Sequence, residues 1–418
     1  MTRTLPLLKV FHTSDWHLGR LLYGKKRHKE FESFLNWLLA ALEERKIELL
    51  LIAGDIFDTS NPSPRAQELY YRFLYRVGKT PCQHVVIIAG NHDSPSFLAA
   101  PSRLLQSLNI YVIAQVSENI EDEILIIRNS EGFPRAIICA VPYLRDRDIR
   151  VIQPGESVVD KEKKLIEGIR EHYADIAALA QKKKASLSEE VPIIAMGHLF
   201  VSGGQVLEGD GVRDLYVGSL AHISSSIFPE SLDYVALGHL HIPQKVPGSV
   251  PIRYSGSPLP MGFGEAKQQK SLCELTFQLQ HPVSIELIPI PNFQKLVRIQ
   301  GGWKIIESQL RVLIQKKLNA WIEIIMEGEN LLSNPREHLL ELISGTELEI
   351  LRIKAKPTAA HLPCPNPAAE TLQNLNVVDV FEHCLEIHQI SPDIRSQLRK
   401  AYQEIVLGTY DLPNLVEK

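Results

Sequence analysis

Residues 85–93 read Val-Val-Ile-Ile-Ala-Gly-Asn-His-Asp. A short, continuously apolar run that ends at a glycine is typical of a buried strand in a parallel sheet. In open α/β sheets, ligands bind beyond the carboxyl ends of the strands, so Asn91, His92 and Asp93 are placed for chemistry. Four other stretches of the chain repeat this arrangement.

These stretches carry polar groups of one chemical kind. Together with Asn91 they supply Asp15, His17, Asp55, His198, His239 and His241. Nitrogen and oxygen donors without sulfur are ligands for manganese, iron or zinc rather than for a copper or structural zinc site. If two ions share one carboxylate, each receives about four ligands. The ions then lie roughly 3.5–4 Å apart, which suits in-line displacement at phosphorus.

Local spacing suggests how these groups converge. In the pairs at residues 15 and 17 and at residues 239 and 241, extended backbone would point both side chains to one side. A glycine precedes four of the seven candidate ligands. We expect each of these glycines to permit a sharp turn out of its strand.

Strands and helices alternate along the first 290 residues, which predicts a layered α/β domain. Apolar runs predict strands at 7–12, 47–53, 85–89, 124–127, 136–141, 192–196 and 234–237. Apolar residues at helical spacing predict helices over 31–42, from the prolines at 62 and 64 to residue 77, near 97–108 and over 160–184.

The chain beyond residue 290 contains no candidate ligands. Its pattern predicts a β-α-β-α-β string over 291–355, which we interpret as a separate small α+β domain. Residues 356–370 include four prolines by position 367 and are interpreted as a linker. Two amphipathic helices over 371–418 complete the chain. They are suited either to docking on a partner or to packing on the chain's own surface.

Composition sets further bounds on function. The 418 residues carry a formal net charge of −4, so no global basic field indicates nucleic-acid binding. The five cysteines show no Cys-x-x-Cys spacing, and we find no signal peptide or membrane-spanning run. We therefore expect a cytoplasmic protein without a membrane partner. Gly78-Lys79-Thr80 lacks the first glycine of a P-loop, because Phe73 stands there, so no nucleotide cofactor is expected.

Five motifs occur in order over residues 15–241: Asp-x-His, Gly-Asp-x-x-Asp, Gly-Asn-His-Asp, Gly-His and Gly-His-x-His. They resemble the motifs of the calcineurin-like metallophosphoesterase family. The resemblance implies a layered β-sandwich flanked by helices in residues 1–290, a capping domain that contacts DNA in 291–355, a linker in 356–370 and a partner-binding helical tail in 371–418.

The family pattern also implies roles for individual residues. Two divalent cations, expected to be Mn²⁺, would be bound at neighbouring positions. One would be held by Asp15, His17, Asp55 and His241, and the other by Asp55, Asn91, His198 and His239. His92 would act as an acid or as a donor to the phosphate, and Asp93 would orient His92. Asp58, which ends the second motif, is a further catalytic candidate.

A narrower resemblance concerns residues 13–19, 54–59, 212–218, 236–241 and 253–258. These stretches are similar to those of bacterial nuclease subunits that act with an SbcC-like ATPase. This implies a DNA nuclease in repair, recombination and replication, cutting double-stranded ends as an exonuclease and single strands and hairpins as an endonuclease. It also implies a heterotetramer with the ATPase, containing a homodimer joined through apolar helix faces near 69–74 and 97–108.

Two other functions compete with the nuclease. The motifs alone equally allow a metallophosphodiesterase that acts on a small nucleotide or phosphoester. A metal-free scaffold on the same fold is disfavoured, because every ligand position is retained. Serine/threonine phosphatases fit poorly, because Asp58 is followed by Thr59 and the third motif ends in Asp93 rather than glutamate.

Overall fold

The structure is a computed structural model of the chain. It describes residues 7–149, 156–205, 223–279, 281–327 and 335–356, and in the tail only Phe381, Leu385, Arg395, Leu398, Arg399 and Tyr402. The chain divides into one unit of Met1–Met326 with Asn330–Ala355 and a second of Glu327–Glu329 with Lys356–Lys418. The predicted linker, most of the helical pair and the motif at 212–218 lie outside the described residues.

A six-stranded sheet contains the first three motifs. Its strand order is β14 (Ser284–Pro289), β13 (Ser271–Phe277), β1 (Leu8–Thr13), β4 (Leu49–Ala53), β5 (His84–Ile88) and β6 (Ile110–Ile113). β5 pairs in parallel with β4 on one side and β6 on the other, and all its residues are buried. The prediction of a buried parallel strand before Asn91 is therefore confirmed.

A second six-stranded sheet contains the other two motifs. Its strand order is β11 (Gln244–Val246), β12 (Ile252–Tyr254), β10 (Tyr234–Gly238), β9 (Ile193–His198), β8 (Pro134–Ala140) and β7 (Ile124–Arg128). β8, β9, β10 and β12 run parallel to one another. Both sheets therefore bring the carboxyl ends of parallel strands to a common edge.

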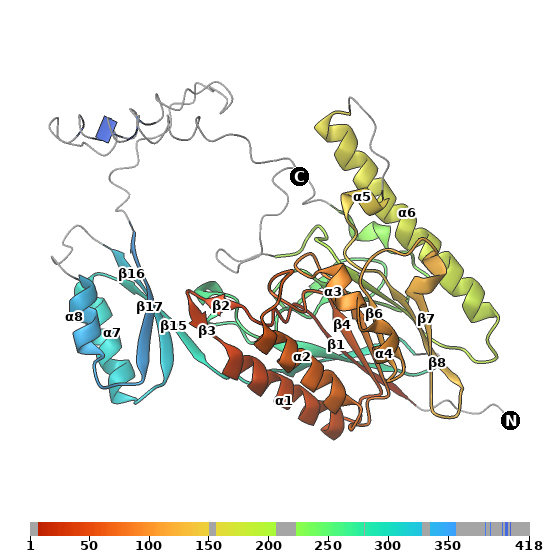
Figure 1. The fold of residues 1–418 in the computed structure, drawn as a ribbon, viewed down its shortest axis with the longest axis horizontal. Coiled ribbons are helices and arrows are strands. Elements are labelled where there is room, and N and C mark those ends of the chain that lie inside the picture. Colours follow the sequence, from red (N-terminus) through yellow and green to blue (C-terminus); the bar gives the residue numbers. More distant parts are fainter. Residues whose placement is uncertain are drawn as a thin grey trace. The chain divides into compact units, whose positions relative to one another are not determined.

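Apolar side chains join the two sheets face to face. Their contact layer includes Leu51 and Ile88 from the first sheet and Ile138, Met196 and Ala236 from the second. The outer face of the first sheet is covered by α1 (His28–Glu44) and α2 (Pro64–Val77), and that of the second by α6 (Val158–Ala185) (Figure 1). This arrangement confirms the layered α/β sandwich.

The helix predicted near 97–108 is interrupted. Two short helices replace it, α3 (Pro95–Ala99) and α4 (Ser102–Gln106), because Pro101 between them has no N–H for a continuous helix. Of the two faces predicted to form a homodimer, the one at 69–74 has most of its apolar side chains buried against α1 and the first sheet, and Tyr71 is partly buried. On the other face, Leu104 and Leu108 are 70% and 54% exposed.

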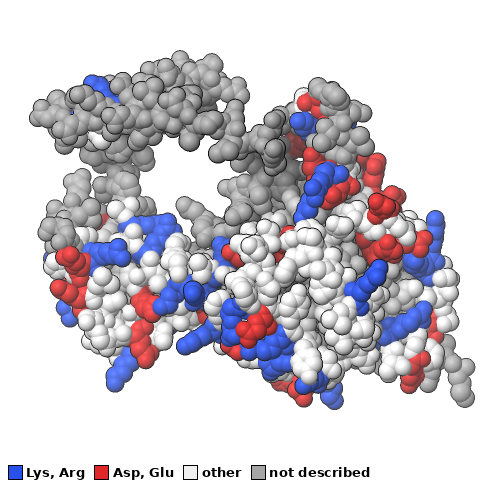
Figure 2. Space-filling model, viewed as in Figure 1, with Lys and Arg blue, Asp and Glu red and all other residues white. Residues whose placement is uncertain are grey.

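Residues 295–356 contain the predicted β-α-β-α-β order: β15 (Lys295–Gly301), α7 (Trp303–Gln315), β16 (Ala320–Glu327), α8 (Pro335–Leu342) and β17 (Leu348–Lys356). α7 and α8 lie along one face of the three-stranded sheet (Figure 1). On the other face, Leu296 and Trp321 pack with Leu22 and Phe263, beside the hairpin of β2 (Leu21–Leu22) and β3 (Lys25–Lys26). Figure 2 shows lysine and arginine side chains gathered around this sheet and hairpin.

The helical positions described in the tail belong to the two predicted amphipathic patterns. The rings of Phe381 and Tyr402, one from each pattern, stack with their centroids 3.9 Å apart. Among the helices that the structure describes, none is both long enough and apolar enough to cross a bilayer.

The buried histidine of β1 makes stability depend on pH. His12 Nε2 donates to the carbonyl of Leu237 at 3.2 Å, and Nδ1, 3.1 Å from the hydroxyl of Tyr234, accepts from it when the ring is neutral. Burial lowers the pKa of His12 from about 6.5 to about 3. Between these values the unfolded chain binds a proton that the folded chain does not, so stability falls as the pH falls through this range.

We predict that this histidine removes about 2 kcal/mol of stability between pH 7 and pH 5. His12→Gln should retain hydrogen bonds to Tyr234 and Leu237 and lose this pH sensitivity. Urea unfolding of both chains at the two pH values, in a chelator, measures the difference. Equal pH sensitivity in the two chains would refute this assignment.

Candidate metal centre

All seven predicted ligands lie at the common edge of the two sheets. In the first sheet, Asp15 and His17 follow β1, Asp55 follows β4 and Asn91 follows β5. In the second sheet, His198 ends β9, and His239 and His241 follow β10. Residues that are far apart in the sequence are thus brought together, because parallel strands direct their carboxyl ends to the same edge.

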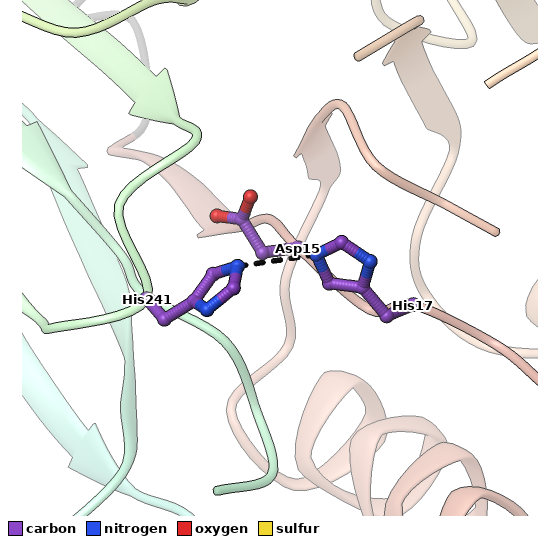
Figure 3. Close-up of side chains that lie close together, drawn as sticks. All are labelled: Asp15, His17 and His241. Carbon is purple, nitrogen blue, oxygen red and sulfur yellow. Dashed lines mark hydrogen bonds between the residues drawn. The ribbon is translucent and has the colours of Figure 1, made fainter. Parts of the chain in front are cut away.

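One group of ligands surrounds His17. Its Nε2 lies 3.2 Å from Nε2 of His241 and 3.6 Å from Oδ2 of Asp55. Figure 3 shows a ring nitrogen of His17 and one of His241 directed at each other, with the carboxylate of Asp15 beside them. Ligand atoms of Asp15, His17 and His241 all lie within 4.8 Å of one another, and all three residues are buried.

A second group surrounds Asn91. Its Oδ1 lies 3.0 Å from Nε2 of His198 and 3.0 Å from Nδ1 of His239. His198 Nε2 is also 3.3 Å from Oδ2 of Asp55. The carboxylate of Asp55 therefore faces both groups, as a shared ligand must.

The chemistry of these donors fits divalent cations. His198 Nδ1 donates to the carbonyl of Ala53 at 2.9 Å, so Nε2 of the neutral ring carries a lone pair directed at the oxygens of Asp55 and Asn91. Burial alone would lower the pKa of His198, but the carboxylates of Asp55 and Asp15 outweigh it and raise the pKa to about 9. A bound cation would be stabilised by the lone pairs of this nitrogen and of the oxygens of Asp55 and Asn91, which otherwise face one another.

The carboxylate of Asp55 is held in its ionised form. Its burial favours the neutral acid, but the rings of His198 and His17 outweigh burial and hold the pKa of Asp55 below its usual range. Its Oδ1 also accepts a hydrogen bond of 2.9 Å from the backbone N–H of His92. A shared ligand therefore carries its charge near neutral pH.

The backbone at Asp15 and His17 is left-handed rather than extended, with φ of 53° and 47°. Our explanation of their convergence by extended backbone is therefore wrong. The N–H groups of Asp15 and His17 instead donate to the carbonyls of Gly54 and Asp55, at 3.0 and 2.9 Å. The two ligands converge because the loop after β1 pairs with the loop after β4.

Of the four glycines predicted to permit sharp turns, Gly54 has the left-handed backbone that favours glycine, with φ of +83°. Gly238, before His239, has no positive φ but makes a close contact instead. A Cβ at residue 238 would lie 1.8 Å from the carbonyl oxygen of Ala53, at the end of β4. Glycine is required there because the edges of the two sheets touch.

His92 lies at the rim of the first ligand group and is half-buried. Its ring is 4.9 Å from that of His17, centroid to centroid, and Nδ1 donates to the carbonyl of Asp58 at 2.8 Å. The neutral ring then presents Nε2 as an acceptor, so it can donate to a phosphate only when protonated. Burial lowers the pKa of His92, which favours the neutral ring in the free protein.

Asp93 does not orient His92, and this prediction is wrong. Its carboxylate accepts hydrogen bonds from the backbone N–H groups of Gly90, Ile56 and Phe57, at 2.9, 3.1 and 3.0 Å. Buried N–H groups require such partners, and loops provide few of them. Asp93 therefore joins the loops after β4 and β5.

Asp58 supports a ligand. Its Oδ1 lies 3.3 Å from Nδ1 of His17 and accepts a hydrogen bond of 3.0 Å from Arg20. A carboxylate on the second nitrogen of an imidazole ligand fixes the direction of the first nitrogen. Sequence reasoning missed Arg20, although it lies only three residues after His17. Trp16, between the two ligands of the first motif, is buried against Phe34 and Phe73.

Comparison with known protein families gives two matches. Residues 8–243 match the calcineurin-like phosphoesterase family, and residues 292–389 match the family described as type 5 capsule protein repressor C-terminal domain. The first match spans all five motifs, and the second includes the three-stranded sheet.

Individual relatives are similar over much of the chain. The SbcD component of nuclease SbcCD from Escherichia coli K12 is 31% identical over 397 residues, covering 94% of this chain and 97% of that protein. The SbcD components from Rhodobacter capsulatus and Bacillus subtilis are 35% and 30% identical, over 299 and 336 residues. These alignments cover 70% and 80% of this chain, and 71% and 82% of the respective relatives.

The contact at Gly238 generates a prediction. Gly238→Ala should push the sheet edges apart, lower stability by about 1–3 kcal/mol and weaken Mn²⁺ binding, because His239 and His198 lie beside the contact. Urea unfolding and Mn²⁺ titration measure the two effects. Gly78→Ala is the control, since Gly78 has φ of −60° and its nearest atom would lie 3.7 Å from the new Cβ. Equal behaviour of the two variants would contradict the argument.

Proposed function

We propose that this chain, which belongs to the calcineurin-like phosphoesterase family, cleaves DNA by a two-cation mechanism. Within that family it belongs to the SbcD-type metal-dependent nuclease subunits. These subunits are phosphodiester hydrolases. One observation carries the mechanism. Oδ2 of Asp55 lies 3.6 Å from a ligand nitrogen of one group and 3.3 Å from that of the other. A carboxylate so placed can be shared by two ions.

The proposed mechanism assigns a task to each group of side chains. When bound, two cations, proposed to be Mn²⁺, would lower the pKa of a water and neutralise the phosphate oxygens. His17, aligned by Asp58, and His198, aligned by Ala53, keep their ring nitrogens directed at the centre. Protonated His92 donates to the phosphate or to the departing sugar oxygen. Water attacks phosphorus opposite that oxygen, and the phosphodiester is hydrolysed.

The proposed complex contains an SbcC-like ATPase. We propose two copies of each chain, with residues 371–418 binding the ATPase and the exposed side chains of Leu104 and Leu108 contributing to the contact between the two copies of this chain. We propose that the chain consists of a nuclease domain in residues 1–290, a small DNA-contacting domain in 291–355, a linker in 356–370 and a helical tail in 371–418. The proposed substrates are double-stranded DNA ends, cut as an exonuclease, and single strands and hairpins, cut as an endonuclease.

The test is a nuclease assay on the full chain purified with an SbcC-like ATPase, in Mn²⁺, with and without ATP. We expect linear duplex DNA to be cut. His92→Gln should lose about 10²–10⁴-fold of the rate while Mn²⁺ binding is retained. Asp55→Asn should lose both activity and Mn²⁺ binding, and Glu68→Gln, an exposed carboxylate on α2, should lose neither.

Two results would reject this proposal. One is intact DNA after incubation with the wild-type pair in Mn²⁺. The other is hydrolysis of a small chromogenic phosphodiester without any cleavage of DNA, which would favour the small-nucleotide phosphodiesterase. Light scattering on the same preparation tests the assembly, and a mass below that of two copies of each chain would exclude the heterotetramer.

A basic cluster on the three-stranded sheet supports DNA contact by residues 291–355. Glu323 is only 1% exposed, and three partly exposed cations surround its carboxylate. Arg298 Nε donates to it at 2.6 Å, and nitrogens of Arg352 and Lys354 lie at 3.6 and 3.8 Å. Three cations on one carboxylate leave a net positive surface, in the region where Figure 2 shows lysine and arginine side chains gathered. A DNA backbone has the complementary charge.

We predict that Lys354→Gln weakens DNA binding at all sequences and lowers the slope of log affinity against log salt by about one unit. Anisotropy titrations of labelled duplex in EDTA, at several salt concentrations, give the slope. Lys316→Gln is the matched control, because Lys316 directly follows α7, which lies on the opposite face of the sheet. Equal slopes for the two variants would show that this surface does not contact DNA.

A further inference from the structure

Lys270, just before β13, is a buried cation beside the metal centre. Its side chain is 3% exposed and pairs with Glu265, which is fully buried. Glu265 ends a short 3₁₀ helix, Phe263–Glu265, and accepts a hydrogen bond from the backbone N–H of Met261 at 3.2 Å. Removing two charges from water is costly, so the pair adds little stability by its charges alone. What Lys270 contacts besides Glu265 indicates its function.

Lys270 binds the backbone of a predicted metal ligand. Its Nζ donates to the carbonyl oxygen of His241 at 2.8 Å and to Oγ of Ser257 at 3.1 Å. The backbone N–H of Ser257 donates to the same carbonyl at 3.1 Å. Two donors, one of them charged, therefore fix the peptide group that follows the ring of His241.

The turn that contains Ser257 packs directly on this ligand. Gly256 has φ of +75°, and a Cβ there would lie 2.7 Å from the carbonyl oxygen of His241 and 2.7 Å from the ring of Pro243. The turn thus holds the backbone of His241 without an intervening side chain. Any change in the position of the turn would move this ligand.

The same turn also reaches a ligand from the other sheet. Oγ of Ser255 lies 2.8 Å from Oγ of Ser14, which in turn donates to Oδ2 of Asp15 at 2.5 Å. Asp15 and His241 come from different sheets and belong to the same ligand group. One turn, fixed by Lys270, therefore supports both.

We propose that Lys270, neutralised by Glu265, is the positioning residue for His241 and sets the affinity of the cation site formed by Asp15, His17, Asp55 and His241. The inference rests on the proposed two-cation function. The second site should depend less on Lys270, because the turn bonds directly to His241 and Ser14. It reaches the second ligand group only through Asp15, which accepts a hydrogen bond of 2.9 Å from the backbone N–H of His239.

Three variants of the full chain separate positioning from stability. Glu265→Gln leaves Lys270 able to donate to His241, so both cations should bind nearly as in the wild type. Lys270→Met leaves a buried carboxylate without its cation and should destabilise the chain. The double variant Lys270→Met/Glu265→Gln removes that carboxylate's charge, so it should recover stability without restoring the donor to His241.

The measurement is Mn²⁺ titration of each variant followed by electron paramagnetic resonance, with thermal unfolding in a chelator as the stability measurement. We expect two ions per wild-type chain. In the folded double variant, one ion should bind as in the wild type and the other about 10–100-fold more weakly, with loss of the spin-coupled pair signal.

Arg135→Met is the matched control for loss of a buried cation. Arg135 donates to the carbonyl of Leu7 at 2.8 Å and to Glu48 at 3.1 Å, at the opposite ends of the strands. It should lower stability and leave both Mn²⁺ affinities unchanged. A double variant that is as stable as the wild type and binds both ions equally tightly would overturn the role of Lys270. A wild-type chain with fewer than two Mn²⁺ sites would instead reject the two-cation function itself.

Discussion

The contact between the end of β4 and the end of β10 determines how the two sheets meet. It is close because residue 238 has no side chain, and the apolar layer between the sheets holds it in place. Each sheet alone carries only part of the centre. A slip of one residue, about 3.3 Å along a strand, would separate ligand atoms that now lie 3.0–3.3 Å apart across the sheets. The chemistry therefore depends on the packing register of the whole sandwich.

Much of this arrangement was predictable from the sequence. Parallel strands place their carboxyl ends together, so an apolar run followed by a ligand is enough to bring Asp55 near Asn91. The left-handed backbone of Asp15 and His17 was not predictable, because it results from pairing with a loop about 40 residues away in the sequence. Asp93 was misassigned for a similar reason, since its partners are backbone N–H groups that carry no sequence signal.

The polar groups around the centre fall into two kinds by what they contact. His17 and His198 have one nitrogen directed at the centre and the other directed at a protein oxygen. Asp58 has a carboxylate on one such nitrogen, while Asp93 and Lys270 bind backbone groups of the loops that carry the ligands. Side-chain contacts therefore support the loops that carry the ligands, although loops usually form the more mobile part of a site.

Four predicted ligands occupy backbone conformations that favour glycine: Asp15, His17, Asp55 and His239 have φ of 53°, 47°, 50° and 104°. Such a conformation costs a residue with a side chain about 1 kcal/mol or more. Glycine at these positions would relieve that strain and abolish the ligand. Selection for stability alone would favour the loss of these ligands. Selection for the function of the centre is therefore needed to keep them.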